Sequence, residues 1–146
     1  MCLTIVLDEK DKMIIDMLMR NSRTPITEIA RRLGITDVAV KKRLEKLERE
    51  GVILGYTIKI NPSKLGYESI AIVGLDVEPE HLLKAIDEIK ARDYVKYLAL
   101  TTGDHMLIAE IWAKNNNDLI SKLNEINNIV GIKNVRPAIV LEVLKN

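Results

Sequence analysis

The sequence lacks several features that would point to particular classes of protein. Its one cysteine, Cys2, cannot form an internal disulfide, which excludes a disulfide-stapled scaffold and favours a reducing compartment. It has no phenylalanine, one tryptophan and four tyrosines, so valine, isoleucine and leucine must fill the core. No apolar run approaches the roughly 20 residues of a membrane span, and residues 1–7 are too short and lack the basic start of a secretory signal. We therefore expect a cytoplasmic protein with no membrane partner.

Residues that perform catalysis or bind metals are also scarce. The sequence has two histidines and shows no Ser/His/Asp or Cys/His arrangement, no P-loop, no Gly-x-Gly-x-x-Gly motif and no metal-ligand cluster. His81 has no cysteine, histidine or aspartate at metal-ligand spacing. His105 follows a glycine in a predicted turn, where a histidine is usually a surface or hydrogen-bonded residue. We therefore expect no enzyme, no metal site and no resident cofactor.

Charge and composition divide the 146 residues into two parts. Residues 1–60 carry 12 Lys/Arg against 9 Asp/Glu, a net charge of +3, whereas residues 61–146 carry 10 against 12, a net charge of −2. The turn-rich stretch 61–66 separates helical patterns from alternating strand and helix patterns. We expect one domain over residues 1–60, a hinge over residues 61–66 and a second domain over residues 67–146.

The first part predicts three short helices. Asp8 is an acidic cap before a run with helical spacing, and Thr24-Pro25 predicts an N-cap followed by proline at the first position of the second helix. Gly34 ends that helix, and Thr36 caps the third. Residues 52–60 then predict a strand with a bend at Gly55.

The second part predicts a repeated strand–helix–strand unit. The predicted strands are residues 69–77, 94–101, 106–113 and 138–144, and the predicted helices open at Glu78-Pro79 and at Asn116 or Asn117. This order is that of a ferredoxin-like βαββαβ domain, whose antiparallel sheet has both helices on one face. The expected fold class is therefore α+β.

Apolar residues on both faces of the predicted sheet leave two interpretations open. Neighbouring positions such as Ile72 and Val73, or Leu107 and Ile108, point to opposite faces of a strand. Either a second subunit packs on the face without helices, or these are the scattered apolar residues of an ordinary surface.

The second and third predicted helices, with the turn between them, have the layout of a helix-turn-helix. With Val40 buried, a step of about 100° per residue turns Val38 and Lys42 outward. Residues 31–46 carry six basic and two acidic side chains, and such lysines and arginines neutralise phosphates and release counterions. Val38 and Ala39 lie where they can contact thymine methyl groups. A solvated helix face has a similar mixture, so spacing alone leaves DNA binding and a plain surface both open.

Several short motifs occur in one order along the whole chain. They are Leu7-Asp8-Glu9-Lys10-Asp11, Glu28-Ile29-Ala30-Arg31-Arg32-Leu33-Gly34-Ile35-Thr36, Val40-Lys41-Lys42-Arg43-Leu44-Glu45-Lys46-Leu47-Glu48, Gly51-Val52-Ile53-Leu54-Gly55-Tyr56 and Gly103-Asp104-His105-Met106. Their order and spacing resemble those of the Lrp/AsnC (feast/famine) regulators, most of all the archaeal branch. The resemblance implies an N-terminal winged helix-turn-helix followed by a ferredoxin-like sensing and oligomerisation domain.

The resemblance also implies a function and partners. It implies a sequence-specific transcriptional regulator that binds double-stranded DNA at roughly palindromic promoter sites and represses its own gene. It further implies homodimers built through the sheet faces, stacked into tetramers, octamers or larger assemblies, with the strand from Gly55 to Ile60 paired to the partner chain. The alternative is a sensing or interaction module without DNA binding, which the basic third helix argues against.

Two sets of site residues follow by position from the resemblance. The DNA contacts are Thr36, Val38, Ala39, Lys41, Lys42 and Arg43 on the third helix, with Arg23, Thr24 and Thr27 near the DNA backbone; the geometry of the helix face adds Lys46. Arg43 lies beside the apolar stripe, so it either braces the second helix or reaches a phosphate.

The second set forms the expected effector site, the turn made by Thr101, Thr102, Gly103, Asp104 and His105. Met106 stands where many relatives have an acidic residue, and a thioether cannot pair with an α-ammonium group. Both an amino-acid effector and a regulator without a known effector therefore stay open.

Overall fold

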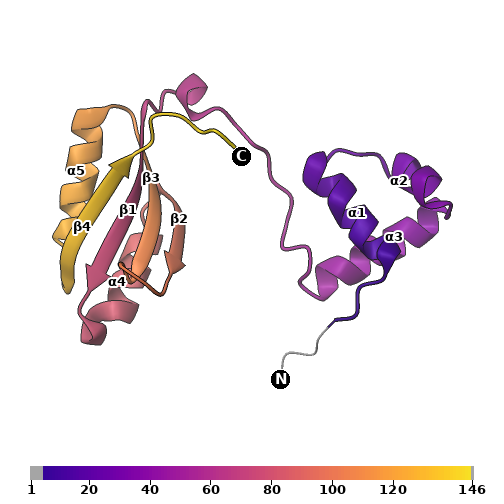
Figure 1. The fold of residues 1–146 in the computed structure, drawn as a ribbon, viewed down its shortest axis with the longest axis horizontal. Helices are drawn as coiled ribbons and strands as arrows, with labels where there is room; N and C mark the ends of the chain where they lie inside the picture. Colours follow the sequence, from indigo (N-terminus) through magenta and orange to yellow (C-terminus); the bar gives the residue numbers. More distant parts are fainter. Residues whose placement is uncertain (1–4, 146) are drawn as a thin grey trace. The chain divides into compact units, whose positions relative to one another are not determined.

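The computed structural model describes residues 5–145, which form two compact units divided between Ile60 and Asn61 (Figure 1). The first unit is helical, and the second is a sheet with helices. Within residues 5–145, no helix combines the length and the apolar composition that crossing a bilayer requires.

Three helices form the first unit: α1 (Glu9–Arg20), α2 (Ile26–Leu33) and α3 (Asp37–Arg49). Each helix contributes apolar side chains at helical spacing to one small core. The core consists of Ile14, Ile29, Ala30, Leu33, Val40 and Leu47. Complete burial of a valine, leucine or isoleucine side chain contributes roughly 1.5–3 kcal/mol, so these contacts hold the three helices together.

The sequence predicts two of the three helix starts correctly. Asp8 is the N-cap of α1, and Thr36 is the N-cap of α3, where its hydroxyl accepts a hydrogen bond from the third backbone N–H of the helix. The start of α2 was predicted one residue too early, because Pro25 is the N-cap rather than the first helical residue. The Thr24 hydroxyl caps no helix; it donates to the Asn21 carbonyl oxygen at 2.6 Å.

A tight turn joins α2 to α3. Gly34 ends α2 with φ = +63°, a left-handed conformation that glycine adopts without a steric penalty. The N–H of Ile35 then donates to the carbonyl oxygen of Ala30 at 3.1 Å, which satisfies the end of α2. The predicted helix-turn-helix is therefore confirmed.

The strand predicted for residues 52–60 is wrong for the single chain. The N–H groups of Val52 and Ile53 both donate to the carbonyl oxygen of Leu47, after which the backbone runs on without strand pairing. The side chains of Leu54 and Ile58 are 94% and 75% exposed. A strand requires hydrogen bonds to a neighbouring strand, and no described strand of this chain pairs with the segment.

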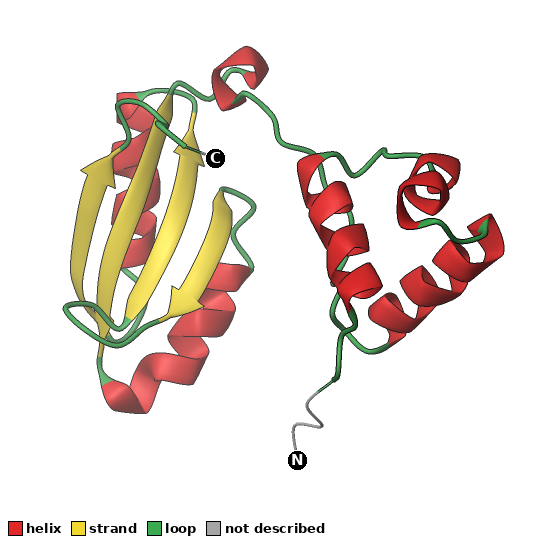
Figure 2. Ribbon diagram, turned by 45° about the vertical axis from the view of Figure 1, so that its right-hand side comes forward, coloured by secondary structure: helices red, strands yellow, loops and turns green. Residues whose placement is uncertain are grey.

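The second unit has the predicted ferredoxin-like order. Its strands are β1 (Ser69–Val77), β2 (Val95–Leu100), β3 (Leu107–Ala113) and β4 (Ile132–Ile139), and its α-helices are α4 (Leu82–Lys90) and α5 (Asn116–Asn127). Short 3-10 turns, η1 (Pro62–Leu65) and η2 (Pro79–His81), precede β1 and α4. The sheet order is β2-β3-β1-β4, every neighbouring pair is antiparallel, and both helices lie on one face (Figure 2).

The core of the second unit lies between this face and the two helices. Alternate residues of the two central strands point under the helices, as in the pair Val73 and Ala109 across β1 and β3. Ala85 and Ile89 of α4 and Ile126 of α5 cover them. The residues between them in β1 and β3 point to the other face, which no described helix covers.

Several boundaries in the second unit differ from the prediction. β2 and β3 are shorter by one residue at one or both ends, and α4 begins at Leu82, after a 3-10 turn. The N-cap of α5 is Asn115, one residue before the nearer of the two predicted caps. The last strand covers Ile132–Ile139 rather than residues 138–144. β4 is an edge strand paired only with β1, and an edge position tolerates polar residues and Pro137. Those residues hid the strand from a search for apolar alternation.

Candidate DNA-binding and effector-binding sites

The exposed face of α3 carries the main candidate residues for DNA binding. Lys41 and Lys42 are exposed, Lys46 is half-buried, and none of the three forms an ion pair with a carboxylate in residues 5–145. Val38, at the start of the helix, is 61% exposed although it is apolar. Thr36 is exposed beside it, and the neighbouring Ala39 is half-buried. The helix therefore presents positive charge and small side chains on one accessible surface.

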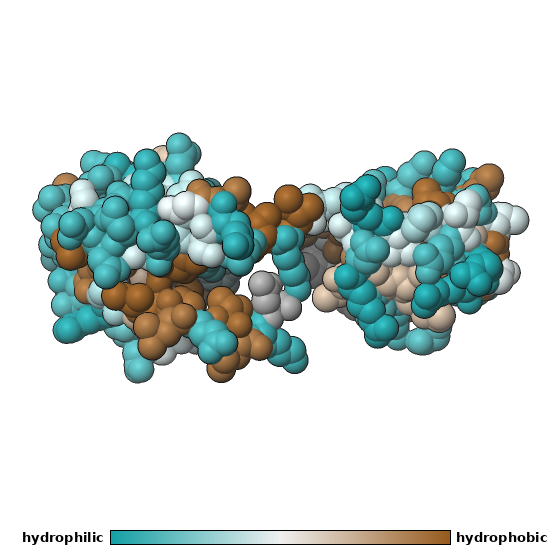
Figure 3. All heavy atoms as spheres, turned by 90° about the horizontal axis from the view of Figure 1, so that it is seen from above, coloured by the Kyte–Doolittle hydropathy of each residue, from teal (hydrophilic) through white to brown (hydrophobic). Residues whose placement is uncertain are grey.

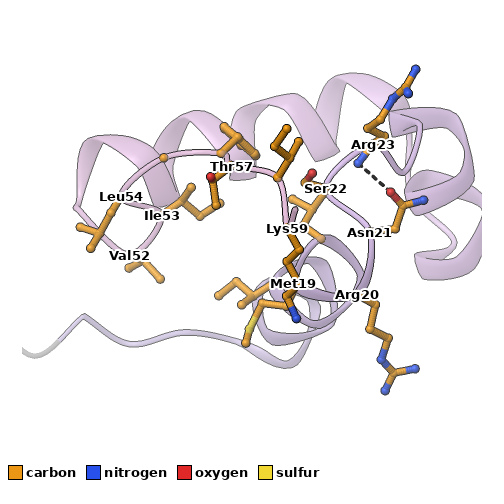
Figure 4. Close-up of a pocket in the computed structure, with 15 residues that line it drawn as sticks. Met19, Arg20, Asn21, Ser22, Arg23, Val52, Ile53, Leu54, Thr57 and Lys59 are labelled. Atoms are coloured by element: carbon orange, nitrogen blue, oxygen red, sulfur yellow. Dashed lines mark hydrogen bonds between the residues drawn. The ribbon is translucent and has the colours of Figure 1, made fainter. Parts of the chain in front are cut away.

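Two of the three residues predicted near the DNA backbone are exposed, and the third is hydrogen-bonded within the turn before α2. Arg23 is exposed, its backbone N–H donates to the Asn21 side chain at 3.0 Å, and its guanidinium points away from the pocket drawn in Figure 4. Thr27 is exposed on the first turn of α2. Thr24 is half-buried, and its hydroxyl hydrogen is used within the turn.

Arg43, one of the predicted DNA contacts, has charged partners within the first unit. Its Nη1 atom donates to Asp8 Oδ2 and to Asp11 Oδ1, both at 2.7 Å. The Arg43 side chain is 28% exposed and that of Asp11 only 2%. In the first unit, Arg43 therefore braces α1 rather than α2. The spacing of α3 could not reveal its partners, because they lie 32 and 35 residues away in the sequence.

A cavity of about 540 Å³ lies in the first unit, between the C-terminal end of α1 and residues 52–59 (Figure 4). Met19 and Leu54 contribute apolar surface to its lining, which Arg20 and Arg23 also border while their guanidinium groups point away from it. Sequence reasoning missed this cavity, because one wall is the segment that the periodicity assigned to a strand.

The predicted effector turn is a closed loop between β2 and β3. The N–H of Thr101 donates to the Met106 carbonyl oxygen at 2.9 Å, and the Thr101 hydroxyl donates to the carbonyl oxygen of His105 at 2.6 Å. Thr102, Gly103 and Asp104 remain exposed at the tip. A depression of about 600 Å³ beside the loop is lined by Leu100, Thr101, Thr102 and Met106.

His105 belongs to the sheet rather than to the tip of the loop. Its ring occupies the space above Gly74, where an added Cβ would lie 2.1 Å from His105 Cδ2. Its Nδ1 lies 3.2 Å from Asp76 Oδ1, and the Asn134 amide donates to Asp76 Oδ2 at 3.2 Å. The hydrogen bond with His105, helped by that of Asn134, holds the pKa of Asp76 below its ordinary value.

The structure also brings together three side chains that the search for metal-ligand spacing missed. One ligand atom from each of Glu78, Glu80 and His81 lies within 4.8 Å of the others. The search sought cysteine, histidine and aspartate, and both new members are glutamates. The cluster precedes α4, and carboxylates interact favourably with the positive end of a helix.

The second face of the sheet carries several large apolar side chains around polar ones such as Glu110 and Asp76, and no described helix or strand covers it. This uncovered sheet face includes Ile70, Ile72, Tyr97, Ile108, Trp112 and Ala138. Ile72, in the central strand β1, remains 38% exposed. Figure 3 shows apolar side chains gathered on one side of the second unit, with a hydrophilic surface elsewhere in that view.

Comparisons with known proteins found a matching family for each of the two units. Residues 7–53 match the family described as winged helix-turn-helix DNA-binding, and residues 70–146 match the Lrp/AsnC ligand binding domain. The chain is 50% identical over 141 residues to the HTH-type transcriptional regulator LrpA of Pyrococcus abyssi, covering 96% of this chain and 100% of that protein. It is 48% identical to the regulator of the same name from Pyrococcus horikoshii, with the same coverage.

Solved structures share the fold over nearly the whole chain. The structure of Escherichia coli AsnC has a TM-score of 0.87 and 26% identity and covers 97% of each chain. A transcriptional regulator of Neisseria meningitidis, solved as a complex with L-Met, has a TM-score of 0.89 and covers 97% of this chain and 94% of its own; at 18% identity it supports the fold alone.

These matches agree with the geometry of the two units, which are a helix-turn-helix with a basic third helix and a ferredoxin-like domain. The chain therefore belongs to the Lrp/AsnC family, whose members are DNA-binding transcriptional regulators and not enzymes.

Proposed function

We propose that α3 reads operator DNA through Lys41, Lys42 and Lys46, with Val38 contacting base edges. The observation that carries this proposal is the set of accessible α3 lysines without carboxylate partners in residues 5–145. Such lysines neutralise phosphates and release counterions. Small apolar and hydroxyl side chains at the start of the helix suit thymine methyl groups and phosphates.

The acting species in this proposal is a homodimer. The uncovered sheet face supplies an apolar surface in the second unit, and two copies that pack through it are related by a two-fold axis. Such a dimer presents two α3 helices to the half-sites of a roughly palindromic promoter. Tetramers, octamers or larger assemblies would stack such dimers, and we expect them in the cytoplasm.

The test changes the charge of α3. In the triple variant Lys41→Glu, Lys42→Glu, Lys46→Glu, we expect binding to the protein's own promoter fragment to be lost while the assembly size is kept. The control variant Lys84→Glu, Lys90→Glu, Lys133→Glu makes the same charge change at exposed positions of the second unit and should bind almost as the parent does. Equal promoter affinity of the α3 variant and the parent would refute the assignment and favour a sensing module without DNA binding.

Transcription from the upstream region of the protein's own gene tests autoregulation. In transcription reactions on a template that carries the upstream region of its own gene, we expect the protein to lower transcript yield. A scrambled upstream region is the control. Undiminished transcript from the natural template at saturating protein would argue against self-repression.

We further propose that the loop tip binds a small carboxylate-containing effector. Thr102, Gly103 and Asp104 are exposed there; loop N–H groups suit a carboxylate, and the Asp104 carboxylate suits an ammonium group. The L-Met complex of the Neisseria regulator with the same fold is consistent with an amino acid. A thermal-shift screen of the amino acids should find a stabilising ligand for the parent and a weaker effect in Asp104→Asn. No stabilisation by any amino acid would indicate a regulator without an amino-acid effector.

A further inference from the structure

We propose that Arg43 and Asp11, with Asp8, form a clamp that sets the orientation of α3 and thereby the preference for specific over non-specific DNA. In this proposal Arg43 is a positioning residue that contacts no DNA. The inference rests on the proposed reading role of α3. It adds that a buried carboxylate on α1, Asp11, controls how well α3 distinguishes specific from non-specific DNA.

The clamp uses every oxygen of two carboxylates. Asp11 Oδ1 accepts from Arg43 at 2.7 Å, and Asp11 Oδ2 accepts from the N–H of Asp8 at 3.3 Å. Asp8 Oδ2 accepts from Arg43 at 2.7 Å, and Asp8 Oδ1 accepts from the N–H of Asp11 at 2.8 Å. A fully satisfied network of charged groups has one favoured geometry. The N-cap of α1 and the middle of α3 are thereby fixed to each other.

The clamp and the proposed DNA-reading lysines share the helix α3. Arg43 follows Lys41 and Lys42 on the next positions of α3, and α3 packs mainly on α2. The clamp is therefore a direct polar link between α1 and α3. If Arg43 is lost, the Asp11 carboxylate stays buried without its cation, which is strongly unfavourable. The structure then relaxes by moving α1 and α3 relative to each other.

Such a movement affects specific binding more than non-specific binding. Base contacts require side chains within about 0.5 Å of their productive geometry, whereas non-specific binding depends on the number of phosphates neutralised. The clamp leaves the charges of Lys41 and Lys42 unchanged. Breaking it should therefore lower the ratio of specific to non-specific affinity.

The first test compares two aspartates of α1, Asp11→Asn and Asp16→Asn. Each removes one negative charge, and Asp16 is exposed with no ion pair in the described chain. Simple electrostatics predicts that both variants bind the DNA polyanion more tightly. That effect raises the affinities for promoter and scrambled DNA together and leaves their ratio unchanged. The clamp instead predicts that Asp11→Asn lowers the ratio of promoter affinity to scrambled affinity about tenfold, the effect of one mismatched base pair. Asp16→Asn should keep the parent's ratio.

The second test changes the cation, with Arg43→Lys and Arg43→Gln. Both clamp bonds come from one nitrogen, so a lysine ammonium is able to replace it, and Arg43→Lys should retain most of the specificity that Arg43→Gln loses. The slope of log affinity against log salt should match that of the parent in both variants, because Arg43 binds no phosphate. A slope that falls by about one in Arg43→Gln would show a phosphate contact and overturn the proposal.

Circular dichroism and thermal melts establish that each variant is folded at the temperature of the binding assay. If Asp11→Asn does not fold, Asp8→Asn takes its place, because that side chain is 53% exposed. A folded variant whose ratio equals that of Asp16→Asn overturns the clamp. If the α3 lysine variant also loses binding, the reading role of α3 stands and only the clamp falls. If the lysine variant binds as the parent does, both proposals fall.

Discussion

The contact between Gly74 and His105 shows how much one absent side chain matters on this sheet. Gly74 lies in β1 without a positive φ, so alanine introduces no backbone strain there. A Cβ would nevertheless lie 2.1 Å from the His105 ring, which must then leave its site and its hydrogen bond with Asp76. We expect Gly74→Ala to lower the free energy of unfolding by about 1–3 kcal/mol, measured by urea denaturation.

Two controls isolate this contact. Gly55→Ala, at a position with nothing within 4 Å of the added Cβ, should change stability by less than about 0.5 kcal/mol. In a His105→Ala background, Gly74→Ala should have only a small effect. An equal loss with and without the ring would show that the ring is not the cause.

Asp8 gives a pH dependence with a defined sign. The N–H of Asp11 and the Arg43 guanidinium hold the pKa of Asp8 below its ordinary value of 3.8. A lowered pKa in the folded state adds stability above pH 3.8, and this stability is lost as the pH falls through the lowered value. Asparagine caps helices as well as aspartate does, so Asp8→Asn removes mainly the charge. The Tm difference between parent and variant should therefore be largest near neutral pH and shrink below about pH 4. A difference that stays constant through that range would contradict this origin.

Single residues also mark the limit of sequence reasoning. The outward direction of Val38 and Lys42 follows from helix periodicity and the buried Val40, and both are exposed as predicted. The role of Arg43 could not be predicted in this way, because periodicity gives the direction of a side chain but not a partner on another helix. His105 was predicted at the effector turn, but the space above Gly74 that holds its ring exists only once β1 and β3 have paired.

Among the elements, the cap of α3 is open to a direct test. The Thr36 hydroxyl accepts from the N–H of Ala39 at 3.1 Å, and loss of such a cap lowers stability by about 1 kcal/mol. We expect this loss for Thr36→Ala in urea denaturation. Thr27→Ala changes an exposed threonine inside α2 and should have no effect or a slight stabilising one, because alanine has the higher helix propensity. Equal effects of the two changes would argue against the cap.

The accuracy of the predicted elements follows their physical origin. Helices were predicted well because their hydrogen bonds and caps are local in sequence, as the confirmed caps Asp8 and Thr36 show. β1 was predicted over the same residues, 69–77, because it lies inside the sheet and most of its residues are apolar. β4 was misplaced and residues 52–60 were assigned to a strand that the single chain does not form, since strands at edges and junctions depend on partners that a sequence does not name.

For the whole molecule, the uncovered sheet face leads to a test of assembly. Ile72 lies on that face in the central strand β1, and a glutamate there would place a charge in the proposed dimer interface. We expect Ile72→Glu to weaken dimerisation at least tenfold in analytical ultracentrifugation. Leu83→Glu is the matched control, because Leu83 is exposed on α4, and it should keep the parent's assembly. Unchanged dimerisation of Ile72→Glu would place the interface elsewhere.

At this scale the sequence predicted the βαββαβ order correctly, because the first three strands and both helices have their own apolar patterns, although the last strand was predicted at the wrong residues. It left open whether the apolar residues on both sheet faces form a subunit interface. An apolar pattern predicts which residues are buried but not which element or subunit covers them. The structure narrows that question to a defined surface.

Trp112 lies on that surface as the single tryptophan of the chain. Its ring centroid is 5.5 Å from that of Tyr67 and 5.6 Å from the Lys96 ammonium nitrogen. The first unit contains no tryptophan, so emission excited selectively at the indole band comes only from the sheet. Removing water from this indole shifts its emission toward shorter wavelengths. The emission wavelength of Trp112 therefore reports whether the sheet face is exposed to water or covered. It can be followed as the protein is diluted, without any added label.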